Sequence, residues 1–355
     1  MPKLNRDKKI FSKKKRKKRR FPFWVFLLGL LVLPFLLIDP AAPIQVPTPS
    51  GLTVVASPLP TFTPLPLPTF TPLPYPTGVH GGRIIFTCQR GEFNQICMVN
   101  RDGTGLLQVT HDSIHHYYPA FSPQGEAVIY ASNQSLGTFD LYLLVLSTSQ
   151  NIELTHEIGN VFSPDFSPDG QRILFINRAE ADAPTGLWVM DHNGENPRLL
   201  YGGPNYAGPN TLVAAAWGPD NRTVALAMSE NQLFEYEIFL FDTQTQEAPR
   251  RVTYGLLGIT GSVDWSPDGR YLLISAGPPL DKDVFRYEIE TGIFTQFTDG
   301  GNNNSATYSP DGEYIVFNSL RNNDQADLYI MRADGSDLKQ ITENPEPDWQ
   351  PQWEP

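Results

Sequence analysis

The six histidines are the side chains of this 355-residue chain best suited to bind a metal ion or to move a proton near neutral pH. His115 and His116 are adjacent in the sequence, and His111 and His156 are the two histidines that could join them as metal ligands. Adjacent residues of a β-strand point to opposite faces, so His115 and His116 would share a metal ion only in a loop conformation. The alternative is that they are solvated loop histidines. We therefore predict no metal and no cofactor, and keep this pair as the candidate should a metal bind.

Aspartates of a recurring aromatic-Ser-Pro-Asp-Gly pattern are the second group that could do chemistry, as acids or as metal ligands. Copies begin at Phe121, Phe166, Trp217, Trp265 and Tyr308, and a shortened copy begins at Trp353. Turn chemistry already explains the pattern, because Pro presets φ, Asp bonds to backbone two residues on, and Gly takes the left-handed position. We predict structural turns that include Pro123, Asp169, Gly170, Asp268, Gly269, Asp311 and Gly312. No nucleophile elbow, phosphate loop or His-Glu-x-x-His helix occurs, so no catalytic residue is predicted.

The chain has two cysteines, Cys88 and Cys97, too few for a disulfide scaffold and without the second pair that a zinc site needs. Cys88 ends one predicted strand and Cys97 begins the next strand of the same hairpin. Facing positions would bring the two Cβ atoms within disulfide reach, whereas another register would keep them apart. A disulfide and a pair of free thiols therefore both stay open.

The repeat indicates which elements position these residues. Successive aromatic residues of the pattern lie 43 to 51 residues apart, the period of four-stranded propeller blades. After each turn comes a β-branched apolar run such as 172–176, then a third strand, a tight turn such as Asp334-Gly335, and a short outer strand ending on Thr, such as 338–342. This density of strands leaves no room for helices. We predict an all-β fold in which the aromatic residue of each copy packs between neighbouring blades.

The two ends of the repeat region predict a closed ring. It opens at Gly82 with a second-strand pattern that lacks the preceding turn, and it closes around Trp353 with a first-strand pattern that has nothing behind it. If the C-terminal strand completes the blade begun at Gly82, five blades are continuous and one is composite. Closure also removes exposed sheet edges. The predicted fold is a six-bladed β-propeller over residues 81–355, closed by the C-terminal strand.

Three segments are predicted ahead of the propeller: a basic cytoplasmic tail (1–20), a single transmembrane helix (21–38) and a Pro/Thr-rich extended linker (39–80). Residues 21–38 carry no charge and would extend about 27 Å as a helix. A cleaved secretory signal is the alternative, but prolines crowd its only small-residue site, Ala41-Ala42. Basic residues directly before an apolar span hold that end in the cytoplasm. This topology places the propeller on the extracytoplasmic side of a cell membrane.

The linker contains the eight-residue sequence of 59–66 a second time at 67–74. Its prolines remove backbone donors and restrict the residues before them, which excludes a helix or a central strand. We predict a polyproline-type stalk, with a ligand for a recognition domain as the alternative reading.

Charge is divided unevenly along the chain. Twelve of the 27 Lys and Arg lie between Lys3 and Arg20, which leaves 15 bases against 37 acids in the remainder. Nucleic-acid binding requires clustered Lys and Arg on the folded body. Because the folded body is acidic, we predict no nucleic-acid partner.

The repeat resembles that of the TolB-like six-bladed propellers, with close matches at Trp265 to Gly269 and Tyr308 to Gly312, and also that of the propellers of tricorn protease and the dipeptidyl peptidase IV group. The Trp217 copy departs from it, with Gly218 in place of Ser and Asn221 in place of Gly, which leaves the shape of that turn open. Neither the α/β domain of TolB nor the hydrolase domain of the peptidases is expected here. The resemblance implies a binding scaffold outside the cytoplasm without an enzymatic domain, and it assigns no catalytic residue.

Connections between blades gather on one rim of a propeller, around the mouth of its channel, and aromatic side chains there suit recognition. The predicted rim surface comprises His115, His116, Tyr117, Tyr118, Tyr201, Tyr206, Tyr254 and Trp349. The leading hypothesis is a non-enzymatic, membrane-anchored binding or scaffold module for a protein, peptide or glycan. The alternative is a metal-dependent lyase or hydrolase acting on extracellular polymers, since sugar-acid lyases built on related propellers use a histidine cluster. A third hypothesis is a purely architectural envelope component.

Overall fold

The computed structural model describes residues 82–355 except 135–136, 181, 204–210, 231–234, 256–257, 260–261 and 323–324. Every regular element in these residues is a β-strand, as the repeat predicts. No helix capable of crossing a membrane is found in this part of the chain. The basic tail, the transmembrane helix and the Pro/Thr-rich linker predicted for residues 1–80 lie outside the described residues.

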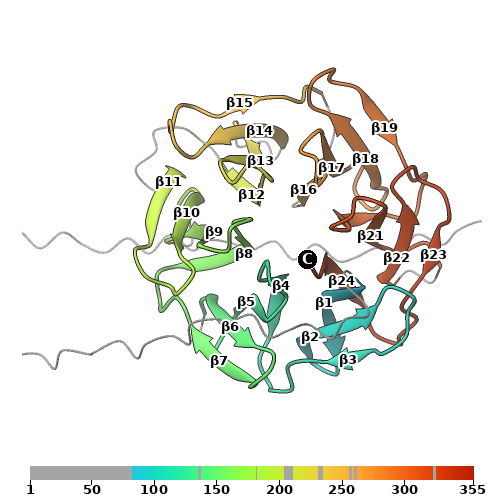
Figure 1. The fold of residues 1–355 in the computed structure, drawn as a ribbon, viewed down its shortest axis with the longest axis horizontal. Helices are drawn as coiled ribbons and strands as arrows, with labels where there is room; N and C mark the ends of the chain where they lie inside the picture. The colour runs from blue at the N-terminus through green and yellow to red at the C-terminus, as the bar shows by residue number, and fades with distance from the viewer. Residues whose placement is uncertain are drawn as a thin grey trace, which may run out of the picture. The chain divides into compact units, whose positions relative to one another are not determined.

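Six four-stranded sheets surround a central axis as blades, which confirms the predicted six-bladed propeller (Figure 1). Each blade runs from an inner strand at the axis to an outer strand at the periphery. Blade 1 contains β24 (Asp348–Trp353), β1 (Arg83–Arg90), β2 (Phe93–Asn100) and β3 (Leu107–Gln108); blade 2 contains β4 (His116–Phe121), β5 (Ala127–Ser132), β6 (Asp140–Val145) and β7 (Gln150–Glu153); blade 3 contains β8 (Asn160–Phe166), β9 (Arg172–Arg178), β10 (Gly186–Asp191) and β11 (Arg198–Gly202). Blade 4 contains β12 (Thr211–Trp217), β13 (Thr223–Ser229), β14 (Glu237–Asp242) and β15 (Arg250–Arg251); blade 5 contains β16 (Val263–Trp265), β17 (Tyr271–Ala276), β18 (Asp283–Glu288) and β19 (Phe294–Gln296); blade 6 contains β20 (Asn304–Tyr308), β21 (Tyr314–Ser319), β22 (Asp327–Arg332) and β23 (Lys339–Gln340).

The second strand of each blade is buried on both sides because the blade packs between two neighbours. Every residue of β5 is buried, and β9, β13, β17 and β21 leave at most their end residues partly accessible. Strands buried on both faces have near-continuous apolar sequences. This double burial explains why the second strands were recognisable as apolar runs, whereas the partly exposed outer strands β3, β15 and β23 have no such pattern.

The outer strands end before the closing threonines that the sequence pattern included in them, because these threonines do not continue the strand pairing. The run 338–342 contributes only Lys339 and Gln340 to β23. Thr342 instead accepts, on its Oγ1, a hydrogen bond from the backbone N–H of Leu328 at 2.9 Å. Thr110, Thr155, Thr253 and Thr298 make the same bond to the third strands of blades 1, 2, 4 and 5. The repeated Thr thus connects the outer strand to the third strand through a side-chain hydrogen bond.

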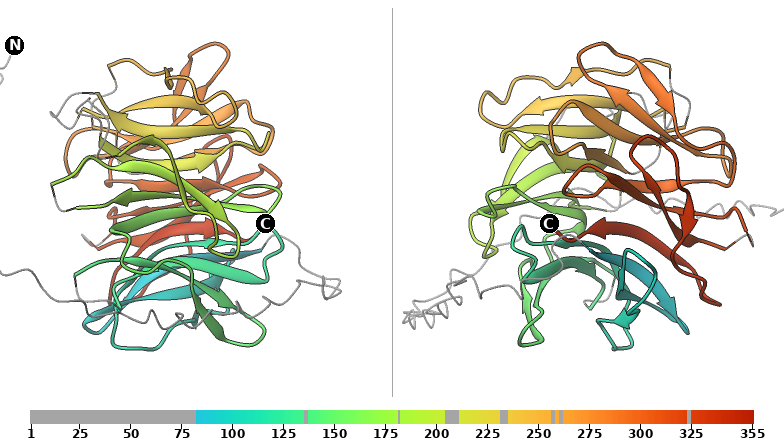
Figure 2. Two further views of the ribbon diagram at one scale, coloured as in Figure 1. Left: turned by 90° about the vertical axis from the view of Figure 1, so that its left-hand side faces the viewer. Right: turned by 45° about the vertical axis from the view of Figure 1, so that its right-hand side comes forward.

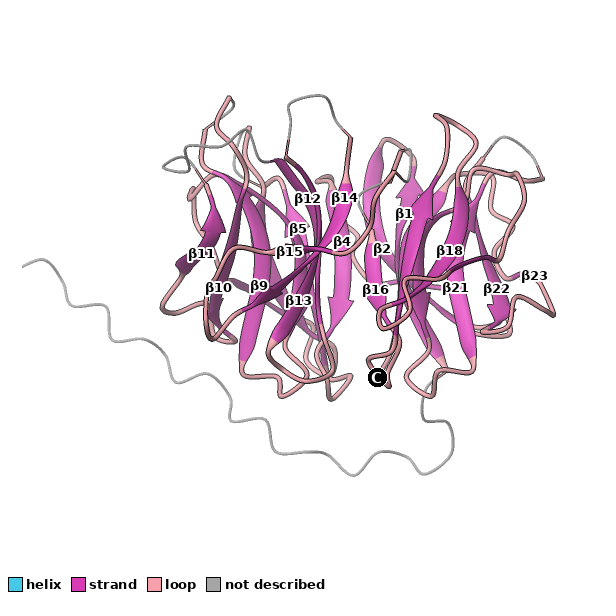
Figure 3. Cartoon of the chain, turned by 90° about the horizontal axis from the view of Figure 1, so that it is seen from above, coloured by secondary structure: helices cyan, strands magenta, loops and turns pink. Residues whose placement is uncertain are grey.

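The repeated turns join the first and second strands of blades 2 to 6, and the face that carries them is here called the turn face. In the blade 3 copy, Asp169 accepts hydrogen bonds on Oδ1 from the Ser167 hydroxyl at 2.6 Å and from the Gln171 N–H at 3.0 Å. Gly170 supplies the left-handed backbone with a φ of 69°. In the divergent blade 4 copy, Asn221 takes that position with a φ of 58°. Loops at the opposite end of the strands form the loop face (Figure 3).

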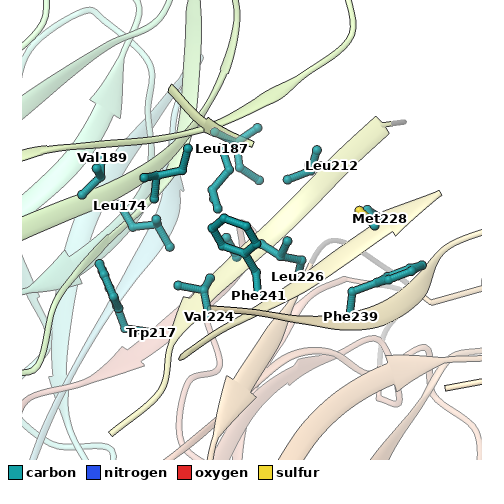
Figure 4. Packing of buried hydrophobic residues seen from close by; sticks show 13 residues of the cluster. Leu174, Leu187, Val189, Leu212, Trp217, Val224, Leu226, Met228, Phe239 and Phe241 are labelled. Carbon is teal, nitrogen blue, oxygen red and sulfur yellow. The ribbon is translucent and has the colours of Figure 1, made fainter. Parts of the chain in front are cut away.

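The aromatic residue before each turn packs against the preceding blade, as the sequence predicts. Trp217 of blade 4 lies in one buried cluster with Leu174 and Val189 of blade 3 and with Val224 of its own blade (Figure 4). Buried aromatic side chains remove large apolar areas from water and dominate such interfaces. The same residue type therefore stabilises each contact between blades.

The C-terminal strand β24 completes blade 1, which confirms the predicted composite blade. It pairs antiparallel with β1, with Trp353 opposite Ile84, so the first and last strands lie side by side (Figures 1 and 2). Trp353 donates its Nε1–H to the Thr307 carbonyl of blade 6 at 3.1 Å. Glu354 accepts a hydrogen bond from Arg83 Nε at 2.7 Å. Closure therefore combines strand pairing, aromatic packing and an ion pair.

Deleting residues 346–355 should open the ring. The deletion removes β24 and exposes the apolar faces of blades 1 and 6, and loss of the Trp353 side chain alone should cost about 3–5 kcal/mol of unfolding free energy. We expect a large fall in melting temperature, measured by circular dichroism, while removal of the exposed Pro355 alone leaves it unchanged. A truncated chain that melts with the full-length chain would show that the ring does not depend on β24.

Cys88 and Cys97 are joined by a disulfide in the structure, inside the buried cluster between blades 1 and 6. The hairpin differs from the predicted one, because β1 and β2 continue to Arg90 and Phe93 and leave a two-residue turn in place of an eight-residue loop. The longer pairing sets the register. Cys88 lies opposite Gln95 and Cys97 lies opposite Phe86, so the two cysteines are diagonal neighbours on one face of the hairpin. Both cysteine side chains are fully buried.

Thiol labelling tests this bond. Protein denatured without reductant should show no free thiol, and after reduction it should show two. Because the bond restricts the unfolded chain, reduction should lower the unfolding free energy by about 2–4 kcal/mol. Two reactive thiols in the unreduced, denatured chain would contradict the disulfide.

Candidate functional site

The inner strands of all six blades line a central channel with a volume of about 100 Å³. Its walls are residues 118–119, 163–165, 214–216, 262–264, 305–307 and 350–352. These stretches contain two acids, Asp165 and Asp264, and no basic side chain. The channel is therefore an acidic feature at the centre of the propeller, and the loops around its mouth on the loop face form the predicted rim.

Four channel-lining residues have left-handed backbone although none is glycine: Tyr118, Ser163, Ser305 and Gln350, with φ between 52° and 56°. The inner strands are irregular at these positions, where the pairing register shifts by a β-bulge. Such a conformation costs about 1–3 kcal/mol per residue and persists where the surroundings enforce it. No glycine marks these bends in the sequence, so they were not predicted.

Gln350 connects the composite blade to Tyr118 at the channel mouth. Its Oε1 accepts a hydrogen bond from the Tyr118 backbone N–H at 3.0 Å and another from the Thr87 hydroxyl at 2.8 Å. The three residues belong to β24, β4 and β1. Closure of the ring thus helps to fix the conformation of Tyr118.

Asp165 and Asp264 occupy the position before the aromatic residue in blades 3 and 5 and bond to the next blade. Asp165 Oδ2 accepts the backbone N–H of Trp217 at 2.9 Å, and Asp264 Oδ2 accepts that of Tyr308 at 2.7 Å. Both keep partial access to the channel, but the surrounding walls separate them from bulk water. This burial raises the pKa of each carboxyl to about 7. Neither acid was predicted as a site residue, because its only signal in the sequence is its place before the repeated aromatic residue.

The structure separates His115 from His116. His115 is half-buried at the channel mouth, where its Nδ1 accepts the Asn94 backbone N–H at 3.2 Å. His116 is the first residue of β4 and is fully buried, so the description of both as solvated loop histidines is wrong for His116. Its Nε2 lies 2.8 Å from Asp112 Oδ1, and burial lowers its pKa although the Asp112 charge opposes this.

The other histidines do not join this pair in a metal site. His111 is exposed, and His156 is an exposed side chain that bonds Glu153 Oε1 at 3.0 Å. Within the described residues, no group of three or more His, Cys, Asp or Glu side chains is arranged to hold a metal ion. The geometry therefore offers the predicted histidine pair no further ligands in this part of the chain.

An aromatic strip crosses the loop face at the junction of blades 1, 2 and 3. Neighbouring ring centroids are 5.4 Å apart for Phe93 and His115, 6.1 Å for His115 and Tyr117, and 6.2 Å for Tyr118 and Phe162. Tyr117 links the two parts through Tyr118 at 6.3 Å and also contacts Phe139 at 5.7 Å. The strip consists of Phe93, His115, Tyr117, Tyr118, Phe139 and Phe162. Rings at these separations stabilise one another and present a rigid apolar surface.

A pocket of about 360 Å³ opens within this strip, between blades 2 and 3. Tyr117, Tyr118, Ala131, Phe139, Asn160, Phe162 and Arg178 line it. Asn160 accepts the Phe139 backbone N–H on its Oδ1 at 3.3 Å and so ties the loop before β6 to blade 3. Binding pockets are typically apolar and aromatic with a few polar groups, and this volume lies in their usual range.

The remaining predicted rim residues are not part of the strip. Tyr254 is 72% exposed, with the Arg251 guanidinium 4.7 Å from its ring centroid, in the connection from blade 4 to blade 5. Trp349 is a half-buried residue of β24, and Tyr201 packs against Phe241. Tyr206 lies outside the described residues.

Three members of the strip, His115, Tyr117 and Tyr118, were predicted from the sequence, and the three phenylalanines were not. Phe93, Phe139 and Phe162 come from three different strand ends, and single phenylalanines next to strands have the appearance of core residues. Only the arrangement of the blades around the axis brings these three phenylalanines to one face. Their proximity is a property of the tertiary structure, for which the sequence held no local signal.

Comparison with protein families matches residues 176–355 to the TolB β-propeller domain, PD40. Among curated proteins, an uncharacterized protein of Agrobacterium fabrum is 38% identical over 88 residues, 24% of this chain and 30% of its own length. The Tol-Pal system protein TolB of Francisella tularensis subsp. mediasiatica is 39% identical over 82 residues, 22% of this chain and 19% of its own length. The chain thus matches less than a third of the length of these relatives.

Solved structures show the same fold. TolB from Acinetobacter baumannii superposes with a TM-score of 0.66 at 22% identity, covering 77% of this chain and 67% of that one. An oligogalacturonate lyase in complex with manganese superposes with a TM-score of 0.53 at 14% identity, covering 74% of each chain. These identities establish the propeller fold alone. The family match confirms the resemblance inferred from the repeat.

The two channel acids should make stability fall as pH rises. Because their folded pKa values of about 7 exceed the ordinary value of 3.8, the folded protein binds their protons more tightly than the unfolded chain. Their contribution is fully present below about pH 4 and is lost between about pH 4 and 7, by roughly 4 kcal/mol per carboxyl. Asp165→Asn combined with Asp264→Asn keeps an acceptor for each N–H and should flatten the pH dependence of chemical unfolding. The exposed Asp281→Asn serves as control, and an unchanged slope in the double variant would contradict the shifts.

Proposed function

The chain belongs to the TolB β-propeller domain family, and on this premise we propose that it is a non-enzymatic binding module that captures a protein partner outside the cytoplasm. The aromatic strip at the channel mouth is the observation that carries this proposal. It gathers six rings from three blades on one face, next to a pocket of about 360 Å³. Rigid aromatic side chains around a pocket are the usual anchors of protein recognition.

The identity of the relatives supports a protein as the partner class. Several of them are Tol-Pal system proteins, a description that names a system of more than one protein. The strip lies where the blades differ most, in the loops, while the turn face repeats one pattern in blade after blade. A partner that contacts the loop face would therefore read residues particular to this chain.

The N-terminal sequence supports membrane attachment as a finer part of the same proposal. The basic residues before 21–38 would keep the N-terminus in the cytoplasm, and the Pro/Thr-rich residues 39–80 would separate the propeller from a cell membrane. Oxidation of Cys88 and Cys97 is compatible with an extracytoplasmic location. The described chain enters the propeller at Arg83, at the turn-face end of β1, on the face opposite the strip.

The alternative of a metal-dependent lyase or hydrolase is not favoured by the described residues. His116 is enclosed by the protein and bonded to Asp112, and no third metal ligand is placed beside this pair. The likeness to the manganese-bound lyase extends to the fold alone at 14% identity. We therefore assign no catalytic residue.

Capture from an envelope extract by the immobilised propeller, residues 79–355, tests the binding function. The double variant His115→Ala/Tyr117→Ala removes two adjoining rings, and we expect it to retain at least about tenfold less of any protein held by the unmodified propeller, since anchor residues typically contribute 2 kcal/mol or more. Ile293→Ala removes a 58% exposed apolar side chain from the turn face and is the matched control. Equal retention by the strip variant and the unmodified propeller would place recognition elsewhere.

A further inference from the structure

The contact between blades 5 and 6 contains a cation at a position that is apolar in the other five blades. Arg286 in β18 lies opposite Leu273 of β17. Because Leu273 packs in the buried cluster shared with blade 6, the Arg286 side chain, on the same face of the sheet, also faces blade 6. The corresponding residues of the other blades are Met98, Leu143, Val189, Leu240 and Ile330. Five aliphatic residues show that the fold itself needs no charge at this position.

Aromatic rings hold the Arg286 guanidinium in place. Its central carbon lies 4.7 Å from the ring centroid of Tyr271 and 5.1 Å from that of Phe297. Among the described residues it forms no ion pair with a carboxylate. Stacking restricts the guanidinium but does not neutralise it, and a half-buried cation without a paired anion is costly. The arrangement is that of a preformed site for an anionic group.

A pocket of about 250 Å³ adjoins Arg286 on the turn face. Asp268, Asp311 and the buried Tyr308 also line it. The turn fixes one oxygen of each acid: Asp268 Oδ1 accepts the Ser266 hydroxyl at 2.6 Å, and Asp311 Oδ1 accepts the Glu313 N–H at 2.9 Å. No hydrogen bond from a described residue engages the second oxygen of either carboxylate. Both acids have pKa values below the ordinary range, held there chiefly by hydrogen bonds from the turn against the opposing effect of burial, so both are ionised at neutral pH.

We propose that this pocket binds a small zwitterion, with its carboxylate on Arg286 and its ammonium group on Asp268 and Asp311. A free α-amino acid carries these two groups. A simple anion would meet repulsion from two carboxylates, and a simple cation would meet repulsion from the guanidinium. A molecule with both charges satisfies all three groups. The planar guanidinium is suited to pair with a carboxylate through two parallel hydrogen bonds.

This site is separate from the aromatic strip, since it lies on the opposite face and between different blades. Failure to bind an amino acid would leave the proposed capture of a protein at the loop face untouched. Conversely, loss of partner capture in the strip variants would not affect the pocket at Arg286.

Calorimetric titration of the full-length chain with three probes tests the proposal. L-Alanine carries both charges, propionate lacks the ammonium group, and ethylamine lacks the carboxylate. We expect alanine to bind with a Kd of about 1 mM, which is within the range accessible to so small a ligand. Each single-charge probe should bind at least about tenfold more weakly, because one charge of the site is then left unpaired. No alanine binding, or propionate binding as tight as that of alanine, would overturn the proposal.

Substitution of the arginine supplies the matched variant. Arg286→Leu introduces the residue found at this position in blades 2 and 4, so we expect it to fold with an unchanged or higher melting temperature and to lose alanine binding by at least about tenfold. Arg198→Leu, at an exposed position of β11, is the control. Asp311→Asn keeps the turn acceptor and should weaken alanine binding independently, which preserves the test if Arg286→Leu fails to fold. Wild-type binding by either variant would refute the assigned roles.

Discussion

Burial of both faces of every blade is the constraint on which this structure depends. A four-stranded sheet with two apolar faces is not stable alone, and each blade here covers its neighbour through an aromatic residue placed before the turn. A linear row would leave two faces exposed, so the row must close. The strand β24 closes the ring, because it supplies the inner strand of blade 1 and packs Trp353 against blade 6. The most distant parts of the described chain are therefore the ones whose contact matters most.

The same constraint separates structural from functional residues. Residues with a structural role recur in most blades with the period of the repeat: the aromatic residue packed between blades, the turn aspartate and the threonine that bonds to the third strand. The Asp of the turn bonds through one oxygen to its own Ser and to backbone, so its repetition alone signals geometry. Asp268 and Asp311 gain their proposed binding role only because Arg286 lines the same pocket. Function has to be sought at positions where one blade departs from the rest. The aromatic strip and Arg286 are departures of this kind, one on each face.

The sequence predicted the fold well because its signals were local and repeated, whereas the site depended on arrangement in space. Turn position, blade number and composite closure all follow from periodicity. The outer strands were predicted to include their closing threonines, because a pattern cannot show that Thr342 bonds Leu328 through its side chain in place of continuing the strand pairing. His116 was placed in solvent because the start of β4 was not recognised. Phe93 and Phe162 lie far apart in the chain, and nothing local marks them as neighbours of Tyr117 and Tyr118.

Ring closure and the candidate binding surface are physically coupled through Gln350. This residue has left-handed backbone in the strand that closes the ring, and its side chain accepts the N–H of Tyr118, whose own backbone is strained in the same way. Strain of this kind lasts only while neighbouring contacts enforce it. The pairing of β24 with β1 supplies those contacts, since the Thr87 hydroxyl of β1 also bonds Gln350. Tyr118 lines both the channel and the aromatic pocket, so the contacts that shut the propeller also shape the surface that we propose recognises its partner.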